Sequence, residues 1–254
     1  MQTIYKMPFV IPTFAVGATG EMRPSALLQF QQEVGEKHLT LWGMDTPALT
    51  AKGLAFVVTR LRVRVWRMPK LDEQVVLTTW HRDTRGVQFF RCYTWTTPDG
   101  VPLVDAVSAF ALVDTVNHNL LRPSTLGVDC PAGEGMVCNC PDPSKETPPA
   151  LIEIAAVRPR WSEIDQNGHV NNTRYADFLC DNVPSGMGQK TITEIALVFE
   201  KETRPDDRLA ITAAEQRFVN EDTTGGTAWV QGNHARGVAF TGKLCFTDSY
   251  ERRF

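Results

Sequence analysis

Residues 165–172 read Asp-Gln-Asn-Gly-His-Val-Asn-Asn, and no other stretch of the 254-residue chain constrains it as strongly. In this octet Asp165, Asn167 and His169 place a carboxylate, a carboxamide and an imidazole at every second position, and two further amides close it. One interpretation is a turn with a helix cap, because Asn, Asp and Gly favour both. A cap needs only one or two such residues. The octet therefore favours a catalytic role over a cap alone, since these groups can act as acid, base and hydrogen-bond donor at one carbonyl.

On either side of the octet, the sequence pattern predicts an extended segment, then a short helix, then four strands. The expected elements are Glu153–Arg160 (extended), Thr173–Asp181 (helix), Thr191–Glu202, Arg208–Val219, Thr227–Asn233 and Val238–Thr247 (strands). Asn171 and Asn172 would open the helix.

The first half of the chain repeats this order of elements. Its expected elements are Thr3–Ile11 (extended), a helix opened by Pro24-Ser25, and strands at Phe56–Trp66, Gln74–Trp80, Gln88–Thr96 and Ala106–Val113. A strand, a helix and a run of antiparallel strands, found twice, predict two related α+β units.

The predicted first helix carries one apolar stripe, formed by Leu27, Phe30, Val34, His38 and Leu41 at three- and four-residue steps. We interpret the histidine as a hydrogen-bonded core residue rather than a ligand. Residues 123–149 hold six prolines and three glycines and no sustained period, which indicates a linker or a wrapped connection between the halves.

One strand has a basic face, because Arg60, Arg62 and Arg64 alternate with apolar residues. A solvated face is the simpler interpretation, and docking of an acidic carrier protein or a phosphate is the functional alternative.

The composition is that of an ordinary globular protein, with 43% hydrophobic and 22% charged residues. A formal net charge of −3 argues against nucleic-acid binding. Pro8 and Pro12 interrupt any signal-like apolar run, and no stretch is long enough to span a membrane. The six cysteines show no paired metal-binding spacing, so we expect reduced thiols in a cytoplasmic chain with no metal and no cofactor.

Common catalytic motifs are missing: the sequence has no G-x-S-x-G, no H-E-x-x-H and no phosphate loop. An octet before a helix N-terminus remains, where free backbone N–H groups can hold a developing oxyanion. These groups suit acyl transfer to water, and thioesters can be hydrolysed without a serine nucleophile.

The segment Trp161–Tyr175 resembles the signature of the acyl-acyl carrier protein (acyl-ACP) thioesterases of plants and bacteria, which are double-hotdog enzymes. Further matches are Phe199–Thr203, where the family places a catalytic glutamate, and Val57–Leu61 with Met68-Pro69 and Thr78–Trp80. One departure is Thr203, where plant members often carry cysteine, and it argues against a Cys-His-Asn mechanism.

The resemblance implies a role for each candidate catalytic residue. Asp165 would be nucleophile or base, Asn167 would donate to the thioester carbonyl, and His169 would orient Asp165 or handle protons. Glu202 would activate or position water. An exposed strand carboxylate is the alternative interpretation of Glu202.

The fold class implied is α+β, a tandem hotdog in which each half is an antiparallel sheet wrapped around a helix. We expect an N-terminal hotdog over residues 1–128, a Pro/Gly-rich linker over 129–149 and a C-terminal hotdog over 150–254. Residues 15–23, where the repeat would place it, carry no counterpart of the octet. The second half would then be catalytic, and the first would bind the acyl chain.

The expected function is release of free fatty acid from acyl-ACP in fatty acid biosynthesis. The partner would be an acidic acyl carrier protein with a phosphopantetheine-linked acyl chain, and neither nucleic acid nor membrane is expected. Two alternatives stay open: an acyl-CoA thioesterase of the same fold, and a non-catalytic fatty-acyl binding module. The chain could also form a homodimer, and its acyl-length preference is not evident from the sequence.

Overall fold

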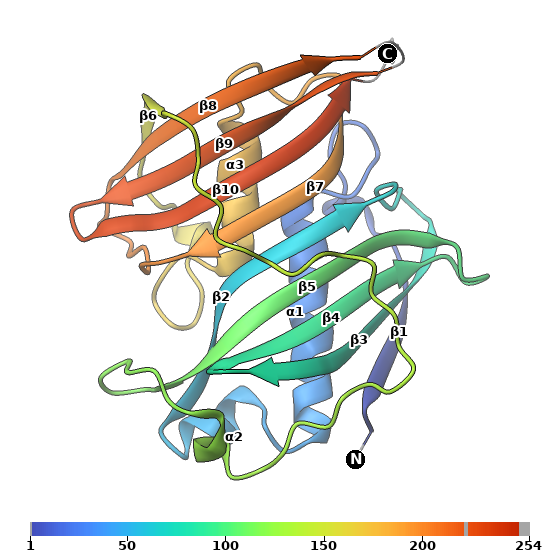
Figure 1. Ribbon diagram of the computed structural model, residues 1–254, viewed down its shortest axis with the longest axis vertical. Helices are drawn as coiled ribbons and strands as arrows, with labels where there is room; N and C mark the ends of the chain where they lie inside the picture. The colour runs from blue at the N-terminus through green and yellow to red at the C-terminus, as the bar shows by residue number, and fades with distance from the viewer. Residues whose placement is uncertain (1, 221–222, 249–254) are drawn as a thin grey trace. The chain divides into compact units, whose positions relative to one another are not determined.

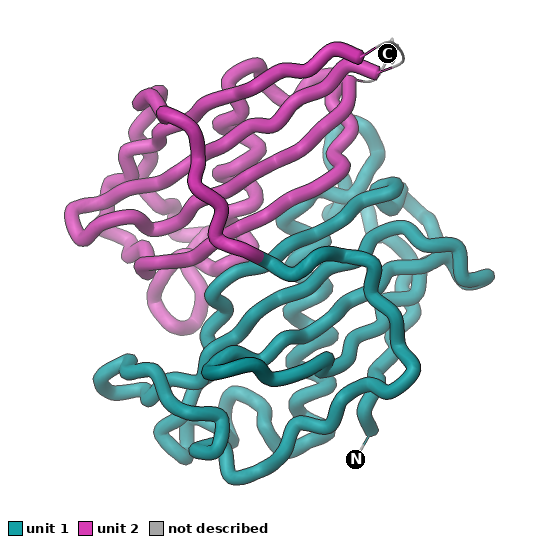
Figure 2. The backbone as a smooth tube through the Cα atoms, in the orientation of Figure 1, with its two compact units in different colours: residues 1–143 teal, residues 144–254 magenta. Residues whose placement is uncertain are grey.

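The computed structural model describes residues 2–220 and 223–248 and divides the chain into two compact units, Met1–Pro143 and Ser144–Phe254 (Figure 2). Each unit contains a five-stranded antiparallel sheet with a helix packed on one face (Figure 1). This arrangement confirms the prediction of two related α+β units. None of the described helices is long and apolar enough to cross a membrane.

In unit 1 the strands follow the order β1-β3-β4-β5-β2, and every neighbouring pair is antiparallel. The elements are β1 (Ile4–Val10), α1 (Pro24–Leu41), α2 (Thr46–Thr50), β2 (Leu54–Val65), β3 (Gln74–Arg85), β4 (Gln88–Thr96) and β5 (Pro102–Asp114), with short 3₁₀ turns η1 (Thr13–Ala15) and η2 (Pro123–Leu126). The predicted strands are therefore all present, and β3 and β5 are longer than their patterns indicate.

Helix α1 packs its apolar stripe on β1 and β3. Leu27, Val34 and His38 are fully buried, whereas Leu41, the last helical residue, is 51% exposed and lies outside the core, contrary to prediction. His38 is a core histidine, as predicted. Its Nδ1 accepts a hydrogen bond from the buried Arg91 at 3.0 Å, so Nε2 carries the proton and donates to the Gln2 carbonyl at 2.9 Å.

The face of the unit 1 sheet opposite α1 is covered by part of the Pro/Gly-rich segment. The Asn139 N–H donates to the Asp105 carboxylate at 2.6 Å, and Arg64 donates to the Asn139 carbonyl at 3.2 Å. Cys140 is buried against β4 and β5. The segment is thus a wrapped connection here. Arg64 is exposed and Arg60 and Arg62 are half-buried, so the basic face of β2 is solvated only in part.

In unit 2 the strand order is β7-β10-β9-β8-β6, again antiparallel throughout. The elements are β6 (Ile152–Val157), η3 (Trp161–Glu163), η4 (Asn172–Arg174), α3 (Tyr175–Asp181), β7 (Lys190–Phe199), β8 (Leu209–Val219), β9 (Thr224–His234) and β10 (Gly237–Asp248). Helix α3 packs on β10 and β9. The ring centroid of its first residue, Tyr175, lies 4.9 Å from that of Phe240, with the two ring planes tilted by 57°.

Strand β7 ends at Phe199, three residues before the predicted end of this strand. Glu202 therefore lies in the loop between β7 and β8 and is not a strand carboxylate. The predicted strand is too long because the charged residues after Phe199 do not interrupt an alternating sequence pattern, as a proline would.

Candidate active site

The octet folds into a tight turn between η3 and η4. The Asp165 N–H donates to the His169 carbonyl at 2.9 Å, and the Gly168 N–H donates to the Asp165 carbonyl at 3.0 Å. Gly168 has a φ of 80°, in the left-handed region that glycine adopts without steric cost. Ile164 and Val170 then pair as an isolated bridge that closes the turn.

Inside this turn the Asp165 carboxylate is held by the backbone. Its Oδ1 accepts the Asn167 N–H at 2.8 Å and lies 3.8 Å from His169 Nδ1. The Oδ1–Nδ1 distance is short enough for an ion pair but too long for a hydrogen bond. The side chains of Asp165 and His169 are 17% and 30% exposed. The carboxylate is thus oriented by the loop, with the imidazole beside it.

Asn167 presents its carboxamide to solvent. The residue is exposed, and among the described residues its side chain has no hydrogen-bond partner. A carboxamide has two N–H donors, so this group can donate to a carbonyl oxygen brought to it.

Asn171 caps the following helix. Its Oδ1 accepts from the Thr173 N–H at 3.0 Å and from the Thr173 hydroxyl at 2.7 Å, as a helix-opening residue does. The first turn is the 3₁₀ segment η4, and the Thr173 N–H is already paired. This N–H is therefore not a free oxyanion donor, whereas the Asn167 carboxamide is an accessible one.

The loop that carries Glu202 is hydrogen-bonded directly to the octet. The Val170 N–H donates to the Thr203 carbonyl at 2.8 Å. The Tyr175 hydroxyl donates to Thr203 Oγ1 at 2.9 Å, and Thr203 is fully buried. Thr203 thus joins the β7–β8 loop to Val170 of the octet and to Tyr175, the first residue of α3, and Glu202 precedes it in the chain.

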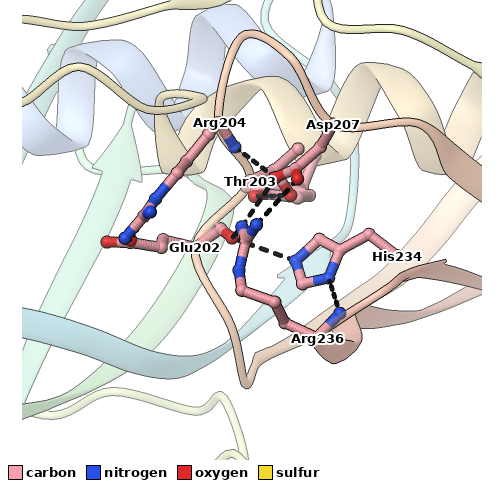
Figure 3. A network of polar contacts seen from close by, with 7 residues as sticks. Glu202, Thr203, Arg204, Asp207, His234 and Arg236 are labelled. Atoms are coloured by element: carbon pink, nitrogen blue, oxygen red, sulfur yellow. Dashed lines mark hydrogen bonds and ion pairs between the residues drawn. The ribbon is translucent and has the colours of Figure 1, made fainter.

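The Glu202 carboxylate accepts the Nε–H of Arg204 at 2.8 Å and also contacts Nη2 of the same guanidinium (Figure 3). The main-chain carbonyl of Glu202 accepts two further bonds, from His234 Nε2 and Arg236 Nη2, each at 3.0 Å. The Glu202 side chain is 28% exposed. Arg204 thus orients a carboxylate that remains accessible.

Asp207 closes the same loop onto the β9–β10 turn. Its two oxygens accept from Arg236 Nη1 at 2.8 Å and Nη2 at 2.7 Å, a bidentate pair, and its Oδ2 also accepts the Arg204 N–H at 2.6 Å. The Arg236 guanidinium holds the pKa of Asp207 below its usual range. Asp207, His234 and Arg236 were not among the predicted site residues, and their only sequence signal is a polar turn, which is common at any surface.

Unit 1 contains the same backbone turn. The Gly17 N–H donates to the Glu21 carbonyl at 2.9 Å, and the Gly20 N–H donates to the Gly17 carbonyl at 3.0 Å. Val16 and Met22 form the closing bridge. The prediction that the first half has no counterpart of the octet is therefore wrong for the backbone, because the turn is repeated there. The one sequence signal is Gly20, which matches Gly168 and has a φ of 71°.

The two turns differ in their side chains. The positions of Asp165, Asn167 and His169 are occupied in unit 1 by Gly17, Thr19 and Glu21. The unit 1 turn therefore lacks the carboxamide and the imidazole, and its carboxylate stands where unit 2 has the histidine. The backbone turn belongs to both units, and the candidate catalytic groups belong to unit 2.

Among solved structures, the fold is similar to an acyl-ACP thioesterase from Bacteroides thetaiotaomicron, with a TM-score of 0.81 at 22% identity over 96% of this chain and 97% of that one. It is also similar to the 12:0-ACP thioesterase from Umbellularia californica, with a TM-score of 0.79 at 19% identity over 97% and 94% of the two chains. These likenesses confirm the double-hotdog fold.

Curated relatives include the chloroplastic palmitoyl-acyl carrier protein thioesterase of Arabidopsis thaliana, 24% identical over 88% of this chain and 58% of that protein. An oleoyl-acyl carrier protein thioesterase of the same plant is 23% identical over 88% and 68%. The chain thus spans about three-fifths of the first relative's length. The acyl-ACP thioesterase N-terminal domain model matches residues 2–123, and the C-terminal domain model matches residues 148–236. The chain therefore belongs to the acyl-ACP thioesterase family.

Proposed function

We propose that the chain hydrolyses the thioester of an acyl-ACP, releasing a free fatty acid and the thiol of the carrier. The observation that carries this proposal is the hydrogen bond between the Val170 N–H and the Thr203 carbonyl, 2.8 Å long. It connects the loop of Glu202 to a turn that already presents Asp165, Asn167 and His169. Four polar groups suited to thioester hydrolysis thus come from two segments tied by one backbone bond.

In the proposed reaction the Asn167 carboxamide donates to the thioester carbonyl as negative charge develops on its oxygen. The Asp165 carboxylate, oriented by the Asn167 N–H, acts as base or nucleophile. His169 lies beside that carboxylate and handles the proton or steadies its orientation. Glu202, held by Arg204, positions the attacking water.

We further propose a division of labour between the two units. The C-terminal domain, residues 150–254, performs the hydrolysis, and the N-terminal domain, residues 1–128, holds the acyl chain. The side chains of the two related turns support this, because only the second turn carries a carboxamide and an imidazole.

The acidic carrier protein is proposed to dock on basic and aromatic side chains that precede the octet. Arg158 and Arg160 are exposed, and Trp161 is 92% exposed, the largest exposed fraction among the described large hydrophobic residues. Arginine and tryptophan are enriched at interface hot spots, and basic groups steer acidic partners.

The test compares acyl-ACP and acyl-CoA substrates with identical acyl chains. We expect kcat/KM to be at least about tenfold higher for the carrier-protein substrate, because charge steering acts on the whole carrier. A preference for the CoA ester would replace the proposal with an acyl-CoA thioesterase. Binding of acyl-ACP without turnover would replace it with a binding module. A profile of released acids across chain lengths would define the acyl preference.

A further inference from the structure

Two side chains converge on one main-chain atom behind the candidate site. His234, at the end of β9, and Arg236, in the β9–β10 turn, both donate to the carbonyl oxygen of Glu202 at 3.0 Å (Figure 3). His234 Nδ1 accepts the Arg236 N–H at 3.1 Å, so its proton must reside on Nε2. The imidazole is therefore held as the tautomer that donates to Glu202.

The network extends along the next residues of the loop. Thr203 is tied to the octet through Val170 and Tyr175. The Arg204 N–H donates to the Asp207 carboxylate, and both oxygens of this carboxylate accept hydrogen bonds from the Arg236 guanidinium. Three consecutive residues, 202–204, therefore each have a main-chain group fixed by a partner outside that triplet.

The Glu202–Thr203 peptide is the junction of this arrangement. The residue before this peptide bond, Glu202, carries the carboxylate. The residue after it, Thr203, carries the carbonyl and the hydroxyl that accept hydrogen bonds from Val170 and Tyr175. A rotation of this peptide would displace the Glu202 carboxylate relative to Asp165 and Asn167. Misplacement of a reacting group by about 1 Å can cost on the order of 100-fold in rate.

We propose that His234 is a positioning residue, which with Arg236 locks the Glu202–Thr203 peptide and thereby fixes where the Glu202 carboxylate lies. This inference rests on the proposed function. His234 acts through the main chain: its Nε2 contacts the Glu202 carbonyl, its Nδ1 contacts the Arg236 amide, and the residue is only 9% exposed. Its effect on the reaction is therefore geometric, and it should appear in kcat rather than in KM.

The test compares His234→Gln with His234→Leu. The glutamine carboxamide can still donate to the Glu202 carbonyl, whereas leucine fills similar space with no donor. We expect kcat on acyl-ACP to fall at least about 10-fold for His234→Leu and less than about 3-fold for His234→Gln, with KM within about 3-fold for both. Arg217→Leu is the matched control, because it removes two ion pairs of the same unit, with Glu215 and Asp248, that do not involve this loop. It should leave kcat unchanged.

A double-mutant cycle with Glu202→Gln separates positioning from a general effect on the fold. If His234 acts through Glu202, His234→Leu should lower kcat by less than about 2-fold once the carboxylate is gone, because the two substitutions then remove the same contribution. Amide hydrogen exchange of the peptide spanning residues 200–208 should accelerate in His234→Leu and not in His234→Gln.

Equal losses in the Leu and Gln variants, full additivity with Glu202→Gln, or unchanged exchange in His234→Leu would each overturn the inference. If Glu202→Gln itself keeps wild-type kcat, the role of Glu202 in the proposed function fails. If Glu202→Gln is impaired and His234→Leu is fully active, only the positioning role fails.

Discussion

The N–H of Val170 donates to the carbonyl of Thr203 at 2.8 Å, and this bond joins the octet to the loop of Glu202. Unit 1 has an equivalent bond, from the Met22 N–H to the Pro69 carbonyl, also at 2.8 Å. Both units therefore use the same backbone frame to attach the turn to the loop that follows a strand. Because the frame is common, the difference in chemistry between the units lies in side chains.

Replacing Asp165 tests the chemistry of the octet with its turn preserved. Asp165→Asn keeps an oxygen that can accept the Asn167 N–H, so we expect the fold and the thermal midpoint to stay near those of the wild type. Turnover on acyl-ACP should fall about 100-fold or more, because the amide can act neither as base nor as nucleophile. Wild-type turnover in a folded Asp165→Asn protein would contradict the role assigned to this carboxylate.

Removal of the Asn167 carboxamide should affect rate without affecting stability. Because this side chain is exposed, Asn167→Ala should shift the free energy of unfolding by less than about 0.5 kcal/mol. Loss of an oxyanion donor should lower kcat by about 100-fold or more. Thr19→Ala, at the equivalent position of the unit 1 turn, is the matched control and should leave kcat unchanged. A drop in kcat for both variants would indicate a structural effect.

Tyr175→Phe should destabilise unit 2. The substitution leaves the buried Thr203 hydroxyl without its donor, at a cost of about 1–2 kcal/mol in the free energy of unfolding. Urea titration would measure it through the midpoint at constant slope. Tyr175→Phe combined with Thr203→Val should recover part of this loss, because the unpaired hydroxyl is removed as well.

Two buried histidines predict a loss of stability in mild acid. Burial lowers the pKa of His38 and of His81 to about 4, whereas an unfolded histidine titrates near 6.5. Between these values the unfolded chain takes up protons that the folded chain does not, so stability is full above about pH 6.5 and falls as the pH drops toward 4.

The expected loss between pH 7 and pH 5 is about 2 kcal/mol per histidine. Denaturant unfolding of the wild type and of His38→Gln at both pH values measures it, and the variant should lose less stability on acidification. Equal pH dependence of stability in the two proteins would exclude His38 as a cause of the loss in acid.

Docking of an acidic carrier predicts a substrate-specific effect of charge reversal. Arg160→Glu should raise KM for acyl-ACP several-fold and leave KM for the matching acyl-CoA almost unchanged, because the repulsion acts on the carrier. The effect should shrink as salt is added. Equal KM changes for both substrates would instead place Arg160 near the thioester.

Local patterns in the sequence predicted the elements and the repeat. Strand periodicity located the described strands, Asn171 was predicted to open the helix, and the apolar stripe placed His38 in the core. These features depend on neighbours within a few residues, so they can be read along the chain. Two of the errors, at Leu41 and at the end of β7, occur at element ends, where burial and pairing rather than propensity decide.

The linkages between distant segments were decided only by the tertiary structure. The Val170–Thr203 and Glu202–His234 bonds join main-chain atoms to partners 32 or more positions away, and a backbone carbonyl has no sequence signature. The sequence by itself determined which chemical groups the octet contains. The fold decided which loop meets them, because that depends on strand register and on hydrogen bonds that any residue can make.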